Sequence, residues 1–231
     1  MSSKVIQRLK QKMKKIKIIY IPYITIREKI HNKPKIKNLH KNGYDVMKKV
    51  TEGFIGTDIK VFCAFGTLLG MVRDNGFIKT DADIDMGVIE TPEFSWDKIE
   101  NTMKKIGLKK MRQFALNGLI TEQTYGENGV TVDFFLYVIK DEQMVANIYC
   151  REVGKSYSSD EQFSVMHSYA PIVCDIQTKM VHDTPVLIPG NSEEYLAKVY
   201  GEGWRYPDPK FKHESIETII PDVYAYGQFW E

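Results

Sequence analysis

The first half of the chain alternates between apolar runs and short polar breaks, as the elements of an α/β protein do. Apolar positions recur at helical spacing over 44–54, which predicts a helix there. The unbroken apolar run over 60–65 predicts a buried strand that stops at Gly66. A short helix over 67–74 and an acidic strand over 81–86 follow. The predicted local order is therefore strand, glycine turn, helix, loop and acidic strand.

The next part of the pattern predicts a helix and then β-hairpins. Thr91 and Pro92 fit the N-cap and first position of a helix that ends near Gly107. Asn117-Gly118 and Asn128-Gly129 are strong hairpin turn signals. The strands that these turns join are 109–116, 119–125 and 130–138. The pattern predicts an α/β (α+β) fold with a mixed sheet flanked by helices.

One more helix is predicted near the other end of the chain. Asn191 with Glu194 three residues later resembles a capping arrangement, and Gly201 is a typical stop signal. Aromatic residues follow at Tyr200, Trp204 and Tyr206. They either pack this helix on the core or form a cage that holds a quaternary ammonium group by cation–π attraction.

Composition divides the chain in two. The 231 residues are 43% apolar, which suits one globular domain. Residues 1–41 hold 13 Lys or Arg against one acidic residue, Glu28, whereas the remainder holds 19 basic and 29 acidic residues. We therefore expect a basic N-terminal arm, 1–41, and a folded domain, 42–231. The arm is either a solvated tail with a short helix or an attachment to an anionic membrane surface, and no nucleic-acid module is recognisable in it.

The cysteines and the first apolar stretch bear on location. Cys63, Cys150 and Cys174 are odd in number and match no metal motif, which favours a reducing compartment. The apolar stretch 16–24 is interrupted by charge and proline and falls well short of the roughly 20 apolar residues that span a bilayer. The expected location is cytoplasmic, free or peripheral on the inner face of the plasma membrane.

Acidic residues are the strongest chemical signal in the sequence. In a strand, Asp81, Asp83 and Asp85 would share one face, and like charges that close need a cation between them. Magnesium is the natural candidate, with manganese as an alternative, because both prefer oxygen ligands. We expect Asp83 and Asp85 to ligate the metal, whereas Asp81 ligates it, orients Asp83 or faces solvent. The alternative is a half-exposed strand with its acids in water.

Other residues can support phosphate chemistry. Asp133 lies in a run of strand formers, where an unpaired buried charge would be costly, so a metal or a salt bridge should compensate it. Gly66 and Thr67 open a helix after a strand, where backbone N–H groups can face a phosphate. Arg73, on the same helix, either reaches that phosphate or is exposed. His167 and His182 have no motif context and are expected to be structural.

Several motifs together resemble the LicD/fukutin family of the nucleotidyltransferase-fold superfamily. They are Gly-Thr-Leu-Leu-Gly from Gly66, Val-Arg at 72–73, Gly-Phe-Ile at 76–78 and Asp-x-Asp-Ile-Asp from Asp81. The segment 195–204, with its Tyr-Gly pair, is similar to the family's terminal segment. The resemblance covers roughly residues 43–209. One departure is Lys-Thr-Asp-Ala-Asp at 79–83, where many relatives have Pro-Trp-Asp-Asp-Asp.

The resemblance implies a magnesium-dependent phosphotransferase. Its donor would be a CDP-activated alcohol such as CDP-choline, CDP-glycerol or CDP-ribitol, and its acceptor a sugar of a surface glycan, free or lipid-linked. The superfamily pattern puts a third carboxylate on a neighbouring strand, as metal ligand or base, and Asp133 fits this position. Two alternatives remain open: transfer of a nucleotide from an NTP, and a noncatalytic glycan- or lipid-binding protein.

Overall fold

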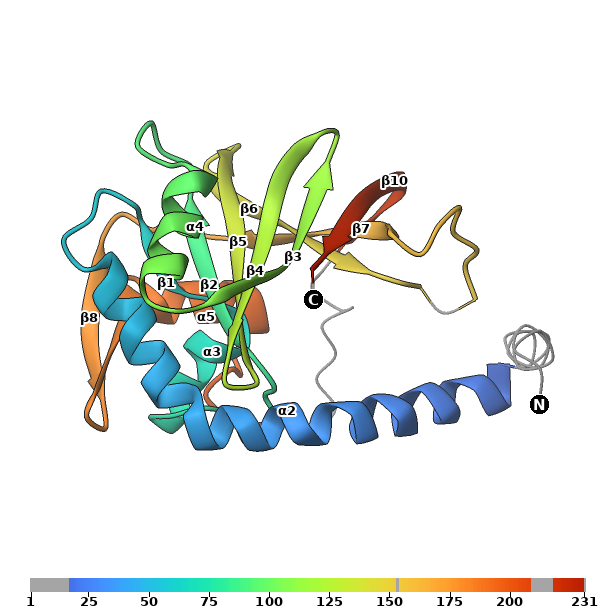
Figure 1. Cartoon of the computed structure of the whole chain (residues 1–231), viewed down its shortest axis with the longest axis horizontal. Coiled ribbons are helices and arrows are strands. Elements are labelled where there is room, and N and C mark those ends of the chain that lie inside the picture. Colours follow the sequence, from blue (N-terminus) through green and yellow to red (C-terminus); the bar gives the residue numbers. More distant parts are fainter. Residues whose placement is uncertain (1–16, 153, 209–217, 231) are drawn as a thin grey trace.

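The computed structural model describes residues 17–152, 154–208 and 218–230, with side chains from residue 32 onward except that of residue 218. Its centre is an eight-stranded mixed sheet in the order β1-β2-β5-β4-β3-β10-β7-β6 (Figure 1). The paired strands β2 and β5 are parallel, and the other pairs are antiparallel. The strands are β1 (Val61–Cys63), β2 (Ile84–Ile89), β3 (Lys109–Leu116), β4 (Leu119–Glu127), β5 (Val130–Lys140), β6 (Gln143–Cys150), β7 (Gln162–Ala170) and β10 (Thr218–Phe229). The predicted mixed α/β fold is confirmed.

The sheet curls back on itself. Strand β6 pairs with β7 at the end of the strand order and also with the last part of β5, from Tyr137↔Ala146 to Lys140↔Gln143. Strands β5, β4, β3, β10, β7 and β6 therefore form a closed ring. A separate hairpin of β8 (Ile176–Val181) and β9 (Thr184–Pro189) lies against β1 and the first helix.

Helices cover both faces of β5. Phe134 contacts Phe54 at the end of α2 (Lys17–Phe54), with ring centroids 5.8 Å apart. Phe135 contacts Phe65 at the start of α3 (Phe65–Leu69), with ring centroids 5.1 Å apart. Because successive residues of a strand point to opposite faces, α2 and α3 lie on opposite sides of the sheet. The remaining helices are α4 (Trp96–Lys105), the π-helical turn η1 (Gly70–Asp74) and α5 (Ser192–Tyr200).

The first helix is longer than predicted. It was expected over 44–54, but α2 begins at Lys17 and crosses the boundary between arm and domain without a break (Figure 1). Residues 32–38 carry mostly exposed or half-buried side chains, so no apolar periodicity marks this part of the helix. The helix joins the domain immediately after this part: Leu39 is fully buried in the core, and Asn42 Nδ2 donates to the carbonyl of Asn128 at 2.9 Å. The predicted attachment of 1–41 to a membrane concerns side chains that lie mostly outside the described residues.

The other predicted elements agree with the structure except at three starts and in β1, which spans Val61–Cys63 rather than 60–65. Helix α4 begins at Trp96 rather than near Thr91, because Ser95 is extended and its Oγ accepts the N–H of Asp97 at 3.2 Å. Helix α3 begins at Phe65, so Gly66 lies inside its first turn. Strand β2 begins at Ile84, after the first two acidic residues of the predicted strand. The three hairpin strands and the helix that stops at Gly201 are confirmed.

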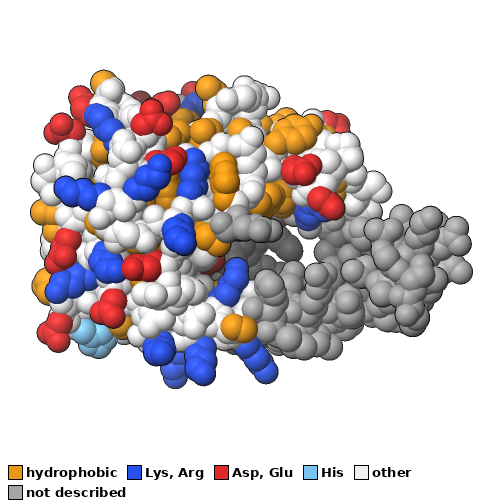
Figure 2. All heavy atoms as spheres, viewed as in Figure 1, with side chains coloured by type: hydrophobic (Ala, Val, Ile, Leu, Met, Phe, Trp, Pro, Cys, Tyr) orange, Lys and Arg blue, Asp and Glu red, His pale blue; other side chains and the backbone are white. Residues whose placement is uncertain are grey.

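Over the ranges that the structure covers, no helix is both long enough and apolar enough to cross a bilayer. Figure 2 shows several lysine and arginine side chains along one edge of the face it presents.

Gly87 in β2 gives a prediction for stability. A Cβ at this position would lie 2.4 Å from Cζ of Phe62, whose fully buried ring contacts Tyr137 and Tyr195. We expect Gly87→Ala to lower the free energy of unfolding by about 2 kcal/mol in urea titrations, because the ring has no space to move. Gly203→Ala is the matched control, since nothing lies within 4 Å of its Cβ position. Equal stability of the two variants would contradict this account.

Candidate active site

A row of polar side chains crosses the sheet on one face. Asp85 in β2 is the register partner of Asp133 in β5, and Asp133 is the partner of Thr124 in β4. Thr124 is in turn the partner of Arg112 in β3. Register partners in a sheet project to the same side, so these four side chains line one face. The structure therefore places Asp133 on the strand next to Asp85.

The predicted acidic strand is wrong in extent, although its carboxylates converge. Only Asp85 lies in β2, whereas Asp83 occupies a bend before it and Asp81 a loop. The loop is shaped by a turn in which the N–H of Asp81 donates to the carbonyl of Ile78 at 3.0 Å. All three carboxylates still act on one another: burial, then Asp83, and then Asp133 and Asp81 raise the pKa of Asp85 well above its usual range.

The other two carboxyl groups are perturbed in the same direction. Burial and the charge of Asp83 raise the pKa of Asp81 to about 7, against the lowering effect of Arg73. Burial and Asp133 raise the pKa of Asp83 to about 6, and Lys35 of α2 opposes this rise. The site thus concentrates negative charge that a bound cation would stabilise.

The start of α3 supports these carboxylates. Gly66 lies beside Asp81, because a Cβ at Gly66 would be 3.0 Å from Oδ2 of Asp81. Thr67 is 1% exposed, and its Oγ1 accepts the backbone N–H of Asp85 at 2.9 Å. Thr67 therefore fixes the start of β2 against α3. Its predicted role of contacting phosphate remains a prediction.

Arg73 faces a cavity at this end of the sheet. Its Nε and Nη2 donate to the two oxygens of Asp74 at 2.8 Å each, and Nη1 lies 3.5 Å from the carbonyl of Trp204. The cavity has a volume of about 430 Å³, and Arg73, Gly66 and Asp81 line it. Arg73 is therefore close enough to contact a molecule in this cavity. The sequence predicted that Arg73 either reaches a phosphate or is exposed, and the first of these requires such a position.

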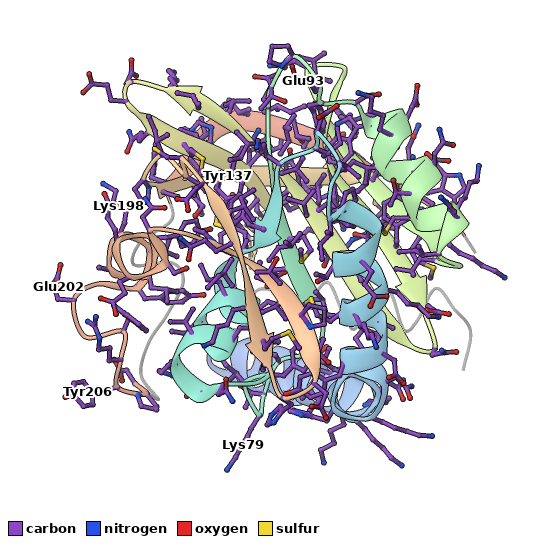
Figure 3. All side chains as sticks on the ribbon, turned by 90° about the vertical axis from the view of Figure 1, so that its left-hand side faces the viewer. Lys79, Glu93, Tyr137, Lys198, Glu202 and Tyr206 are labelled. Atoms are coloured by element: carbon purple, nitrogen blue, oxygen red, sulfur yellow. The ribbon has the colours of Figure 1, made fainter. Side chains whose placement is uncertain are left out.

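The three predicted aromatic residues, Tyr200 at the end of α5 and Trp204 and Tyr206 after it, line the same cavity. Trp204 is 5% exposed and belongs to the hydrophobic core, so it packs the segment on the domain. Tyr206 is 80% exposed, and Figure 3 shows it at the outer end of this segment. Trp204 thus meets the packing expectation, while the wall of the cavity also offers aromatic surface to a ligand.

Asp133 has protein partners. It is 3% exposed, its Oδ2 accepts Nη2 of Arg112 at 3.1 Å, and its Oδ1 accepts the hydroxyl of Thr124. The sequence predicted that either a metal or a salt bridge compensates Asp133, and the salt bridge is therefore present. In the described part of the chain, no three His, Cys, Asp or Glu side chains are gathered closely enough to hold a metal ion by themselves.

Sequence reasoning missed Arg112, Glu122 and Thr124. Glu122 is 3% exposed and lies 3.5 Å from Nη2 of Arg112. Burial and Asp133 raise the pKa of Glu122 to about 8, and Arg112 opposes this rise. His167 contacts Tyr169, and His182 packs against Tyr44, as expected for structural residues.

The chain is similar to known proteins in sequence and in structure. Residues 58–170 match the family model described as LicD/FKTN/FKRP, nucleotidyltransferase domain. A stretch of 66 residues is 35% identical to an uncharacterized protein of Rickettsia typhi (strain ATCC VR-144 / Wilmington), and it spans 29% of this chain and 21% of that protein. The crystal structure of ANT(2")-Ia in complex with adenylyl-2"-tobramycin is similar with a TM-score of 0.42 and 10% identity, over 76% of this chain and 84% of that one.

Proposed function

The chain belongs to the LicD/FKTN/FKRP nucleotidyltransferase domain family through residues 58–170, and we propose that it is a phosphotransferase that moves a phospho-alcohol from a CDP-activated donor to a sugar. The observation that carries the proposal is the pairing of Asp85 with Asp133 on one face of the sheet, next to a loop whose Asp81 lines a cavity together with Gly66 and Arg73. Carboxylates next to a cavity that can hold a phosphorylated donor are what metal-assisted phosphoryl transfer requires.

The chemistry of these carboxylates suits the binding of a magnesium ion. They are oxygen donors that repel one another, and magnesium is commonly bound by one or two carboxylates together with substrate phosphates. We assign Asp83 and Asp85 as its protein ligands, with Asp81 beside them and Asp133 on the neighbouring strand. Manganese has the same ligand preference. When bound, the ion neutralises charge on the phosphate oxygens and on the leaving group.

The residues divide the reaction between them. Arg73 and the backbone at Gly66 hold the donor diphosphate in the cavity, where the aromatic wall of Tyr200, Trp204 and Tyr206 receives the alcohol. Asp133 orients the acceptor hydroxyl and accepts its proton. The acceptor oxygen forms a bond to the donor's β-phosphorus, the bond from that phosphorus to the bridging oxygen breaks, and CMP departs with this oxygen.

The cellular setting is part of the proposal. The acceptor would be a sugar of a capsule, teichoic acid or lipopolysaccharide, either free or as a lipid-linked glycan. The 13 basic residues of 1–41 would hold the protein at an anionic membrane surface on the cytoplasmic side, since each basic residue near such a surface contributes about 1 kcal/mol. No nucleic acid is involved in this proposal.

Product analysis tests the proposed function. Purified protein with magnesium is incubated with CDP-choline, CDP-glycerol, CDP-ribitol, CDP-ethanolamine, CTP and ATP, with and without acceptor glycan. We expect CMP from one CDP-alcohol and no pyrophosphate. Pyrophosphate from CTP or ATP would instead support nucleotide transfer, and ligand binding without turnover in the presence of acceptor would support a binding protein.

A further inference from the structure

Arg112 is the hub of a hydrogen-bond network behind the carboxylates. Its Nε donates to Oγ1 of Thr124 at 2.8 Å, and its Nη2 donates to Oδ2 of Asp133 at 3.1 Å. The same Nη2 lies 3.5 Å from Oε1 of Glu122. The guanidinium also sits over the ring of Phe114, 5.6 Å from its centroid. One cation thus contacts two buried carboxylates, a hydroxyl and an aromatic face.

The network leaves Asp133 little freedom. Because Oγ1 of Thr124 accepts the N–H of Arg112, its own hydrogen is directed to Oδ1 of Asp133. The other carboxylate oxygen is held by Arg112 directly. Both oxygens of Asp133 are therefore fixed through a closed ring of hydrogen bonds that runs through a single guanidinium. The planar fork of arginine suits such two-point binding, and lysine does not reproduce it.

A purely structural role would not require this arrangement. A buried ion pair can often be replaced by apolar residues of similar volume without loss of stability. Here one guanidinium is shared by Asp133 and Glu122, which leaves two buried carboxyl groups with one cation. The sharing is unfavourable for packing alone, and it becomes useful where the carboxylate of Asp133 must keep one orientation.

We propose that Arg112 is a positioning residue for phosphotransfer, which holds the carboxylate of Asp133, directly and through Thr124, in the orientation that receives the acceptor hydroxyl. The proposal rests on the proposed function, in which Asp133 meets the acceptor. Arg112 itself does not touch the donor in this account: the cavity beside Gly66 and Arg73 is lined by other residues. Loss of Arg112 should consequently affect the rate of transfer and leave donor binding intact.

Steady-state kinetics test this role with the CDP-alcohol that the wild type turns over. We expect R112M to lower kcat about 100-fold, since a displacement of about 1 Å can have that effect, while KM for the donor stays within about threefold. R112K should recover at most about tenfold of the loss, because it restores the charge without the fork. T124V, which removes the hydroxyl from the same ring, should lower kcat about tenfold and serves if R112M does not fold.

The control is Arg151, whose guanidinium also lies over a phenylalanine, 5.2 Å from the ring centroid of Phe163. R151M should leave kcat unchanged. Crystal structures of the wild type and R112M test the role of Arg112 without an activity assay. In R112M the carboxylate of Asp133 should leave its wild-type position. If the wild type turns over no donor, the proposed function fails and these structures alone decide the role of Arg112. Near-normal kcat in R112M, or an unmoved Asp133, would overturn it.

Discussion

Asp85→Asn should reduce transfer by at least about 1000-fold, the largest effect that we expect from a single substitution. The change keeps the shape of the side chain and removes the charge that magnesium needs. Folding should survive, because the carboxylate is already destabilised by burial and by its acidic neighbours. The measurement is CMP release from the active CDP-alcohol, with circular dichroism and urea titration as checks of folding.

Asp141→Asn provides the matched control for this substitution. Asp141 follows β5 in a left-handed turn conformation that asparagine tolerates, and it lies away from the acidic site. Its variant should transfer at the wild-type rate. If Asp85→Asn kept turnover within about tenfold of the wild type, the metal assignment would have to be abandoned.

The stability of the metal-free protein should fall as pH rises, by about 3 kcal/mol between about pH 5.5 and pH 7.5. The folded protein holds the pKa of Asp81 at about 7, that of Asp83 at about 6 and that of Asp85 well above its usual range, whereas the unfolded chain has values near 3.8. Within this window the folded state binds protons that the unfolded state has released. Acidification therefore stabilises the fold until it reaches the pKa values of the unfolded chain.

Magnesium should remove much of this pH dependence. The ion binds the ionised carboxylates of the folded state, so saturating magnesium raises the free energy of unfolding at the higher pH. Urea titrations at both pH values, with magnesium or with EDTA, give the four free energies that are needed. Asp85→Asn should show a smaller pH dependence and a smaller response to magnesium. A metal-free protein that is more stable at the higher pH would contradict the clustering of these carboxylates.

Part of the site could be predicted from the sequence, because a recognisable turn fixes the pairing of two of its strands. The Asn128-Gly129 turn pairs Glu127 with Val130, and counting back along both strands places Thr124 opposite Asp133, as the structure has it. The same counting fails for Arg112. Two register shifts interrupt the pairing of β3 with β4, and nothing in the sequence marks them.

The length of α2 and the start of α4 could not be predicted from the sequence, for two different reasons. Residues 32–38 of α2 include no fully buried side chain, so the periodicity that reveals most helices is missing there. Near α4, Thr91 and Ser95 both offer a capping hydroxyl, and only the backbone conformation of Ser95 decides between them. The sequence predicted that the acidic residues cluster, but it did not predict where the strand begins. The loop before Ile84 brings the carboxylates together without the regular alternation of a strand.

The curled sheet has a consequence for self-association. A sheet normally ends in two strands whose free backbone groups can pair with another chain. Here the pairing of β6 with β5 joins the strand at one end of the order back to the middle of the sheet. The opposite end is β1, a strand of three residues beside which the β8–β9 hairpin packs. Among the described strands, the sheet thus offers another chain little unpaired backbone, although β10 carries exposed aromatic side chains at Tyr226 and Phe229.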